Sequence, residues 1–516
     1  MEFEISADYN ASEVLFHNLQ AGREGKVAVY CGDQKVTYGE LAEAASRVGN
    51  GLLKFGLERG DRVLLVLLDS PEFPAAFFGA MRAGLIPVPV NTLARTGDYE
   101  YFLKDSQARA ALVSASLYEK LEPIVGLCPE LEQVVVTGGE SPEGTQAWQK
   151  WTGAAEAELA PATTRSDEPA FWLYSSGSTG TPKAVVHCHL HIPFTVEAYA
   201  KQILEIGPDD LVFSASKAFH AYGLGNSFNF PFSVGASSVL LPGRPEPEAV
   251  FEHIDRYRPS LVFTAPTLYA SMLALPDAEE RWDLASVRLC VSAAEALPAD
   301  VYQRWLERFE IEILDGLGST ELLHIFISNR PGEARPGSSG RLVPGYETRL
   351  LNEQGWPVPP GKPGELLVRG VSAFSQYWNR PDDTERVRLE DWIVTGDQYI
   401  RDDEGYYFCQ GRSDDMMKVG GNWVSPAEVE STLMEHSSVL ECAVVGFKDR
   451  EGLVKPQAFV VLQKGNRASK KLARDLQQHV KSKISHYKYP RRIEFVKSLP
   501  KTATGKIQRF QLREGE

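Results

Sequence analysis

Residues 174–183 read YSSGSTGTPK, a run of hydroxyl side chains and glycines that ends on a single lysine. The apolar segments on either side of it, PAFWL and AVVHCH, are both expected to be strands. Gly177 and Gly180 let the backbone turn and approach a ligand closely, and the surrounding hydroxyl and N–H groups suit phosphate oxygens. The spacing G-x-x-G-x-x-K differs from that of a P-loop. This run alone therefore leaves two interpretations open, a phosphate cradle and a flexible turn.

Outward from this run, strand-like and helix-like segments alternate along the chain. DRVLLVLLD (61–69) is a short continuous apolar run of the kind found in buried parallel strands. The segment 36–56, VTYGELAEAASRVGNGLLKFG, has apolar residues at helical spacing and ends on a glycine. A helix opened by Pro71 follows, then a strand at LIPVPVN (85–91). The alternation predicts an α/β architecture with parallel sheets.

The composition of the chain changes from about residue 337. Short strands separated by Gly and Pro indicate a small antiparallel, β-barrel-like unit. Ser425-Pro426 then looks like the N-cap and first residue of a helix, and the last hundred or so residues read β-α-β-β-α-β. We therefore expect a large N-terminal domain (1–410) with parallel α/β subdomains, a domain boundary at 411–415 and a small α+β domain (416–516).

Length, charge and cysteine usage narrow the class of protein. The chain has 516 residues, too many for one compact core, and a formal net charge of −15, which argues against general nucleic-acid binding. The first residues carry acids where a signal peptide needs a basic stretch, and no early apolar run is long enough to cross a membrane. The six cysteines are scattered, without a C-x-x-C pair. We expect a cytoplasmic protein without nucleic-acid or membrane partners.

Three further motifs carry chemistry. In LDGLGSTELLHIF (314–326) we expect a helix to begin at Ser319, where Thr320 could donate to a phosphate and Glu321 could hold Mg²⁺; a plain capped helix is the alternative. Asp397, at the end of a strand in TGD, suits the two hydroxyls of a ribose, unless it lies in a surface turn. Lys506 lies in PKTATGKIQR (500–509), where a solvated lysine is the ordinary alternative.

Taken in order, these motifs resemble the signatures of the adenylate-forming superfamily, which includes acyl-CoA synthetases, luciferases and peptide-synthetase adenylation domains. The resemblance spans roughly residues 35 to 510. It rests on six segments: YSSGSTGTPKAVVH, VSAAEALP, DGLGSTE, TGD, GRSDDMMKVGG and PKTATGKIQR.

The resemblance implies a two-step reaction. A carboxylate attacks the α-phosphate of ATP to give an acyl-adenylate and pyrophosphate, and a thiol, usually coenzyme A, then displaces AMP. It also implies a small domain that rotates between the two steps. The implied cofactors are ATP, Mg²⁺ and coenzyme A as co-substrate.

The resemblance assigns roles motif by motif. The loop would hold the β- and γ-phosphates, Thr320 the α-phosphate and Glu321 the Mg²⁺, and Lys506 would bridge carboxylate and phosphate. The remaining residues are Ser175, Ser176, Gly177, Ser178, Thr179, Gly180, Thr181 and Lys183 for the polyphosphate; Ala293, Ala294, Glu295, Asp315 and Gly316 around the adenine, with Ser319 also at the nucleotide; Asp397 and Arg412 for the ribose; Asp414 as the hinge; and Gly420 and Gly421 along the pantetheine arm.

The expected acid pocket is aromatic and free of acidic residues. Segment 217–236 offers no Asp for a substrate ammonium group, which argues against an amino-acid activator. AYGLGNSF, GSTELLHIFISN and GLVKPQAFVVL resemble the benzoate-CoA ligase branch. Because His324 lies three residues after Glu321, we expect both on one helical face, with a structural histidine as the alternative. By the resemblance, the pocket is lined by Ala221, Tyr222, Gly318, His324 and Ile325.

One departure and several alternatives remain. His220 follows Phe219 where the benzoate branch has a second Phe, which raises hydroxy- and aminobenzoates as substrates beside benzoate. The basic tail would serve either coenzyme A or an acidic carrier protein, so a stand-alone enzyme that loads a carrier's pantetheine is the main alternative. A nucleotide-binding regulator without catalysis is disfavoured by the intact motif around Lys506. The oligomeric state stays open, a homodimer being one option.

Overall fold

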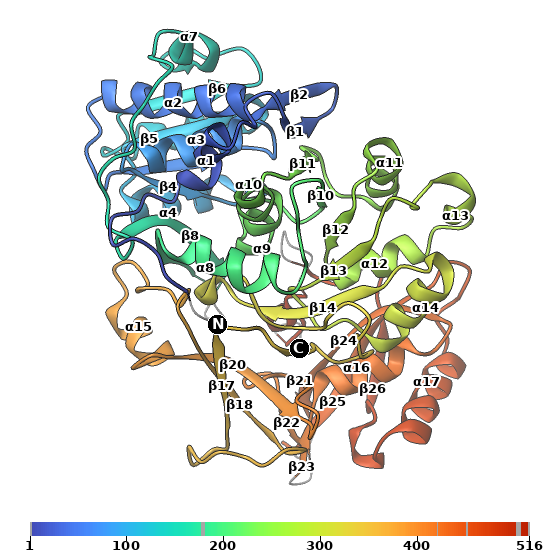
Figure 1. Cartoon of the computed structure of the whole chain (residues 1–516). Helices are drawn as coiled ribbons and strands as arrows, with labels where there is room; N and C mark the ends of the chain where they lie inside the picture. The colour runs from blue at the N-terminus through green and yellow to red at the C-terminus, as the bar shows by residue number, and fades with distance from the viewer. Residues whose placement is uncertain (1–2, 177–180, 420–421, 450–451, 502–506, 514–516) are drawn as a thin grey trace.

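The computed structural model describes residues 3–176, 181–419, 422–449, 452–501 and 507–513. Figure 1 shows two large sheets with their helices, an antiparallel sheet below them and a smaller domain at the C-terminal end of the chain. This is the α/β architecture that the sequence predicts.

A five-stranded parallel sheet, in the order β4-β3-β5-β6-β7, forms the first part of the large domain. Its strand β3 (Arg62–Val66), between β4 and β5, is the apolar run noted above, and its four residues after Arg62 are all buried. Helix α2 begins after Thr37, whose hydroxyl accepts from the amide of Glu40 in a capping box, as N-terminal helix signals require. The other elements of this part are α1 (Glu13–Gln20), α2 (Tyr38–Lys54), α3 (Glu72–Arg82), β4 (Ile86–Pro89), α4 (Thr96–Ser106), β5 (Ala110–Ser114), α5 (Ala115–Tyr118), α6 (Glu122–Val125), β6 (Gln133–Thr137), β7 (Gln146–Ala147) and α7 (Trp148–Gly153).

A nine-stranded sheet, in the order β16-β15-β14-β13-β12-β10-β11-β1-β2, forms the second part. Its strands from β1 to β14 are parallel, and antiparallel strands close both edges. The carboxyl ends of the parallel strands therefore meet at one edge, the usual place for a ligand in such sheets. The strands are β1 (Val27–Cys31), β2 (Gln34–Thr37), β10 (Leu211–Ser214), β11 (Ser237–Leu240), β12 (Leu261–Thr264), β13 (Leu289–Ser292), β14 (Ile313–Gly318), β15 (Ile325–Ser328) and β16 (Arg341–Leu342).

Helical segments cover this sheet, and two of them contain π-helical turns. The segment from Ala221 to Val234 runs as a short α-helix, a π-helical turn and a second α-helix without a break. The helical elements are α8 (His191–Thr195), η1 (Val196–Lys201), α9 (Ala221–Leu224), η2 (Gly225–Asn229), α10 (Phe230–Val234), α11 (Pro247–Tyr257), α12 (Pro266–Leu273), α13 (Ala278–Arg281), α14 (Ala299–Phe309) and η3 (Thr320–Leu322).

Two antiparallel units complete the large domain. The run quoted at the outset joins the hairpin strands β8 (Pro169–Ser176) and β9 (Pro182–Cys188). The expected antiparallel unit is a five-stranded sheet with one helix on it. It consists of β17 (Tyr346–Leu351), β18 (Pro363–Gly370), α15 (Pro381–Val387), β19 (Arg388–Leu389), β20 (Trp392–Arg401) and β21 (Tyr407–Arg412).

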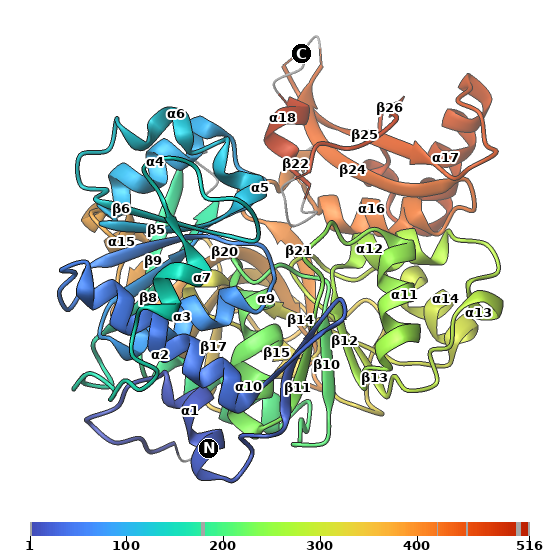
Figure 2. The same cartoon turned by 90° about the horizontal axis from the view of Figure 1, so that it is seen from above.

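The small domain follows β21 and has a core of its own. Ser425 caps its first helix by accepting from the amide of Glu428, as the Ser-Pro pair predicts. In Figure 2 this domain lies against the large one, where α16 packs on β21 and on α14, and β24 contacts α12. Its elements are β22 (Met417–Val419), β23 (Asn422–Val424), α16 (Pro426–Met434), β24 (Val439–Lys448), β25 (Val454–Leu462), α17 (Lys470–Lys483), η4 (His486–Lys488), β26 (Arg492–Phe495) and α18 (Arg509–Arg513).

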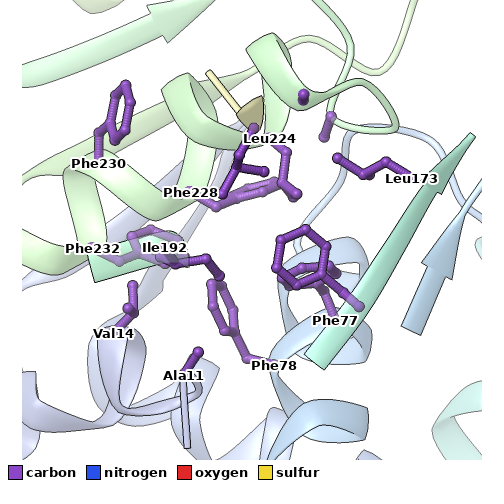
Figure 3. Close-up of a cluster of buried hydrophobic side chains, with 14 of the residues drawn as sticks. Ala11, Val14, Phe77, Phe78, Leu173, Ile192, Leu224, Phe228, Phe230 and Phe232 are labelled. Atoms are coloured by element: carbon purple, nitrogen blue, oxygen red, sulfur yellow. The ribbon is translucent and has the colours of Figure 1, made fainter. Parts of the chain in front are cut away.

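A phenylalanine-rich core joins the two parallel-sheet parts. Figure 3 shows Phe77 and Phe78 of α3 facing Leu224 and Phe228 of the α9–η2 segment. Phe228 is fully buried, and Leu224 lies on the same helix as the predicted pocket residues. Burial of such side chains stabilises a fold by about 1.5–3 kcal/mol each, so this core fixes the wall of the predicted pocket.

The helix expected to begin at Ser319 is absent from the structure. Instead of a helix, Thr320–Leu322 forms a single 3₁₀ turn, and Leu323 then takes a left-handed conformation with φ 67°. The chain turns there into β15, because Ile325 to Ser328 pair with β14. His324 therefore does not share a helical face with Glu321.

Two further features of the described chain are the state of its cysteines and the apolarity of its helices. All six cysteines are free, and four of them are buried. Within the described ranges, no helix combines the length and apolarity that crossing a bilayer would require.

The contact between α2 and α3 depends on glycine. A Cβ added at Gly79 would lie 2.3 Å from the carbonyl oxygen of Ala45, and one added at Gly49 would lie 2.7 Å from that of Gly79. Backbone atoms cannot move aside as a flexible side chain can. We therefore expect Gly79→Ala to destabilise the chain by about 1–3 kcal/mol in urea unfolding.

The matched control is Gly97→Ala in α4, where an added Cβ meets open space. That change should be neutral or stabilise by up to about 1 kcal/mol. Equal losses in the two variants would contradict the close-packing argument.

Four buried histidines and the partly buried His220 predict a pH dependence of stability. Burial lowers the pKa of His187, His189 and His220 to about 4 and that of His324 to about 3, and the pKa of His191 also falls well below its usual value. The unfolded chain binds more protons than the folded one between these values and 6.5. The contribution of these neutral histidines to the free energy of unfolding is thus fully present above pH 6.5. It is lost as the pH drops, by up to about 1.4 kcal/mol per pH unit for each histidine.

Urea midpoints at pH 7.5, 6.5, 5.8 and 5.2 would measure this before most carboxylates titrate. We expect a flat region down to pH 6.5 and a steady fall below it. A midpoint that stays constant down to pH 5.2 would show that these histidines do not stay neutral in the fold.

Candidate active site

The predicted phosphate loop is the tip of the β8–β9 hairpin. Ser175 pairs with Lys183 across this hairpin, and Ser176 pairs with Pro182. Thr181 follows the tip and is exposed. Gly177, Ser178, Thr179 and Gly180 lie outside the described residues.

Lys183 is held beside the loop by an acid and an aromatic ring. Its Nζ lies 3.2 Å from Oδ1 of Asp383 on α15 and 5.2 Å from the ring centre of Tyr377. The side chains of Lys183 and Asp383 are only 12% and 17% exposed. An ammonium group in this position faces little water, so its charge is weakly screened.

Tyr377 also orients Glu321. Its hydroxyl donates to Oε1 of Glu321 at 2.8 Å, and the amide of Phe374 donates to the Glu321 carbonyl at 2.7 Å. Burial, with the charge of Glu321, raises the pKa of Tyr377 well above its ordinary value, so the phenol remains a donor. Tyr377 thus connects Lys183 with Glu321, and the sequence analysis missed it.

The turn that carries Thr320 and Glu321 is fixed from two sides. The hydroxyl of Ser319 accepts from the amide of Leu322 at 3.3 Å, which caps the turn. The carbonyl of Thr320 lies 2.8 Å from Nε2 of His187 on β9. Since a carbonyl only accepts, His187 Nε2 carries the proton, and burial keeps this histidine neutral by lowering its pKa to about 4. The turn is thereby tied to the strand that leaves the loop.

The two segments expected around an adenine lie side by side. Strands β13 and β14 are parallel neighbours, with Ser292 opposite Asp315, so residues 293–295 leave the end of β13 next to residues 315–316 of β14. Ala294 has φ 81°, a left-handed conformation that costs an alanine energy and occurs mostly at functional sites. Asp315 is 4% exposed, its Oδ1 has no hydrogen-bond partner in the described chain, and burial raises its pKa to about 8.

The residues expected at a ribose are also neighbours. Asp397 on β20 stands opposite Arg412 on β21, and Arg412 Nη1 donates to Asp397 Oδ1 at 3.2 Å and to the Thr395 carbonyl at 2.7 Å. Arg412 Nε lies 3.6 Å from Oδ1 of Asp414, the predicted hinge residue. The arginine therefore joins the end of the large domain to the start of the next segment.

The predicted aryl pocket brings together residues from α9, η2 and the β14–β15 turn. His324 is 3% exposed, and its Nε2 lies 3.1 Å from Oδ1 of Asn226. Its ring centre lies 5.6 Å from that of Tyr222 and 4.4 Å from that of Phe230. Burial lowers the pKa of His324 to about 3, so the pocket is uncharged at neutral pH.

Two glycines give His324 its place. A Cβ at Gly225 would lie 2.5 Å from the His324 ring, and one at Gly318 would lie 2.7 Å from the His324 carbonyl oxygen. Ala221 and Ile325 are buried beside this ring system. His324 thus joins the pocket residues, although by a tight turn and not by a shared helix.

Sequence reasoning missed the polar partners in this pocket. Asn226 is fully buried, and Nε2 of His220 has no hydrogen-bond partner within the described residues. Asn226 lies in the quoted segment AYGLGNSF without having been assigned to the pocket, and Tyr199, whose ring centre lies 5.4 Å from that of His324, lies outside the quoted motifs. Their contacts depend on the π-helical turns, which no simple sequence period predicts.

The small domain reaches the nucleotide segment. The backbone amide of Ile507 donates to Oε1 of Glu295 at 2.9 Å. Lys506, the residue before it in the chain, lies outside the described residues, as do Gly420 and Gly421. Within the described residues, the small domain thus contacts the predicted nucleotide site at Glu295.

Comparison with known proteins agrees with this arrangement. Residues 16–378 match the family model "AMP-binding enzyme", and residues 428–506 match "AMP-binding enzyme C-terminal domain". The chain is 51% identical over 513 residues to the benzoate–CoA ligase of Thauera aromatica, covering 99% of this chain and 96% of that ligase. It is 42% identical over 509 residues to the 4-hydroxybenzoate–CoA/benzoate–CoA ligase of Rhodopseudomonas palustris, covering 98% and 94%.

A solved structure is similar over nearly the whole chain. The anthranilate CoA ligase AuaEII in complex with anthranoyl-AMP superposes with a TM-score of 0.96 at 42% identity, covering 99% of this chain and 98% of that one. The chain therefore belongs to the AMP-binding enzymes of the adenylate-forming superfamily, in the branch that contains the benzoate–CoA ligases.

Proposed function

We propose that this enzyme activates a small aromatic carboxylic acid with ATP, forming an acyl-adenylate and pyrophosphate, and then transfers the acyl group to coenzyme A with release of AMP. The observation that carries the proposal is the proximity of two sites. The β13–β14 edge supports the predicted nucleotide segments, and the chain leaving β14 passes directly from Thr320 and Glu321 to the uncharged aromatic pocket at His324. Relatives with the names given above support the same reaction.

The first step requires cations in a dry site. A carboxylate and a triphosphate are both anions, and the transition state adds charge on the α-phosphoryl group. Lys183, little exposed beside the hairpin tip, stabilises the polyphosphate and the departing pyrophosphate. Lys506 bridges the carboxylate and the α-phosphate, and Thr320 donates to the latter.

A magnesium ion fits Glu321. Within the described chain, no group of three or more His, Cys, Asp or Glu side chains gathers as a metal site. Mg²⁺ bound to nucleotides needs only one or two carboxylates, since phosphates and water supply its other ligands. Glu321, oriented by Tyr377, meets that need. The ion would supply charge neutralisation at the phosphates.

The nucleotide contacts follow from the same geometry. The unpartnered Oδ1 of Asp315 is an acceptor in a buried position beside residues 293–295, which suits the exocyclic amine of adenine. Asp397, held by Arg412, offers a carboxylate to the two ribose hydroxyls. Gly316 supports this arrangement because a Cβ there would lie 2.9 Å from the Ile325 side chain.

The pocket favours aromatic acids. The rings of Tyr222 and Phe230 lie against a His324 that burial keeps neutral, and segment 217–236 carries no acidic side chain that could pair with a substrate ammonium group. The Nε2 atom of His220, which has no hydrogen-bond partner within the described residues, supports acceptance of hydroxy- or aminobenzoates beside benzoate, because a buried polar atom gains when a ligand satisfies it. Analogues should differ by only a few kcal/mol, so several acids are accepted.

We further propose that residues 411–415 form the hinge and that Asp414 is its pivot. In this arrangement the amide of Ile507 donates to Glu295 of the nucleotide segment, and we assign this arrangement to the first step. For the second step, rotation of the small domain would bring Gly420 and Gly421 to the pantetheine arm, where backbone without side chains leaves room for it.

The test is AMP release with ATP, Mg²⁺ and coenzyme A over a panel of acids: benzoate, hydroxybenzoates, aminobenzoates, cyclohexanecarboxylate, hexanoate and phenylalanine. We expect turnover with the benzoates and none with hexanoate or phenylalanine. Pyrophosphate release with aryl acids but no thioester would instead indicate a carrier-protein pantetheine as the acceptor. No release with any aryl acid would contradict the proposal.

Lys506→Ala should separate the two steps. Loss of one fixed charge at the reacting phosphate is expected to slow acyl-adenylate formation on the order of 10²–10³-fold. AMP release from supplied benzoyl-AMP and coenzyme A should change little, because that step does not need the same charge. Quenched-flow measurement of pyrophosphate gives the rate of the first step, and measurement of AMP gives the rate of the second.

Lys497→Ala is the control, since Lys497 is an exposed lysine of the same domain. Its removal should leave both steps unchanged. Equal losses of both steps in Lys506→Ala would contradict the assigned role.

A further inference from the structure

We propose that Glu295 acts as a positioning residue that latches the small domain in the orientation for adenylation. The inference rests on the function proposed above and concerns how Lys506 is placed. Its basis is the 2.9 Å hydrogen bond from the Ile507 amide to the Glu295 carboxylate, which crosses from one domain to the other.

The acceptor belongs rigidly to the large domain. Glu295 follows the buried strand β13, only three residues after Ser292, which is fully buried opposite Asp315. The intervening Ala294 has φ 81°, so the loop has a defined and unusual conformation. A carboxylate held in this way accepts a charge-assisted hydrogen bond, which is stronger than one between neutral groups.

The donor belongs rigidly to the small domain. Ile507 pairs with Lys501 as an antiparallel bridge, and the amide of Gln508 donates to the Pro500 carbonyl at 2.8 Å. Arg509 is then joined to Glu430 on α16, with Nη2 lying 2.7 and 2.9 Å from the two carboxylate oxygens. Glu430 also accepts from the amide of Val444 on β24 at 2.7 Å. These contacts fix Ile507 to the folded part of the small domain.

Charge supports the same contact. Glu430, Asp415 and Glu295 all raise the pKa of Arg509, against the effect of burial. The negative charge of Glu295 thus interacts favourably with Arg509, two residues after Ile507. Loss of that charge would weaken the interface beyond the single hydrogen bond.

The position along the chain gives the contact its role. Ile507 directly follows Lys506, so the Glu295 bond fixes the peptide next to the lysine that the first step needs. Glu295 lies on the segment after β13, whereas the proposed hinge follows β21. The bond must break when the small domain rotates for thioester formation. The interdomain bond of Glu295 therefore favours the first step and is absent in the second.

The test compares Glu295→Ala, Glu295→Gln and the control Glu280→Ala, all at saturating ATP. Glu280 is an exposed glutamate on α13, so its removal changes the net charge equally without touching the interface. We expect Glu295→Ala to slow pyrophosphate release from ATP and benzoate on the order of 10-fold, the usual effect of losing a hydrogen bond to a charged group. AMP release from supplied benzoyl-AMP, at saturating benzoyl-AMP and coenzyme A, should fall clearly less than pyrophosphate release.

The conservative variant adds a second criterion. The side-chain carbonyl of Gln still accepts from the Ile507 amide, so Glu295→Gln should recover most of the adenylation rate. Equal losses in both steps, or a rise in the KM for ATP with kcat unchanged, would overturn the latch, because these results indicate a structural or an adenine-binding role.

Hydrogen exchange of residues 507–513 without substrate gives a readout that does not depend on the reaction. Faster exchange in Glu295→Ala than in the wild type and Glu280→Ala supports the latch, and unchanged exchange overturns it. If the wild type activates no aryl acid but Glu295→Ala still exchanges faster than the wild type, the proposed function is contradicted and the interdomain latch is supported.

Discussion

The repulsion between two anions is the constraint on which the arrangement of this enzyme depends. A carboxylate must come within bonding distance of a phosphate, so both must be held in a site with little water and with fixed positive charge. Lys183 is built into the large domain, little exposed beside Asp383 and Tyr377. Lys506 belongs to the small domain in our account. Because the two charges are divided between two domains, Lys506 can move away with the small domain after the first step.

The fold meets this constraint by bringing distant segments to one edge. Parallel strands β13 and β14 end together, and the chain leaving β14 turns at Thr320 into the wall of the aromatic pocket. His187 on β9 contacts the carbonyl of that turn, and Tyr377 donates to its carboxylate. The predicted phosphate hairpin and the segment that leads from the predicted nucleotide site to the predicted acid pocket are thus joined by short polar contacts.

Much of this arrangement could be predicted from the sequence because it depends on local signals. The apolar run of β3, the Thr37–Glu40 capping box and the Ser425–Pro426 helix start all act within a few residues. The turn after Thr320 could not be predicted, because pairing of Ile325 with Gly318 in the sheet overrides the helical pattern. Tyr377 and Asn226 were missed for a related reason: each contact joins residues that are 56 or 98 positions apart.

The central claim is that an acyl-adenylate forms in this site before any thiol takes part. The direct measurement is exchange of labelled pyrophosphate into ATP with benzoate and Mg²⁺ but without coenzyme A. The account predicts exchange that requires the aryl acid and is abolished by chelation of Mg²⁺. Exchange that appears only when coenzyme A is added, or that proceeds without an acid, would contradict it.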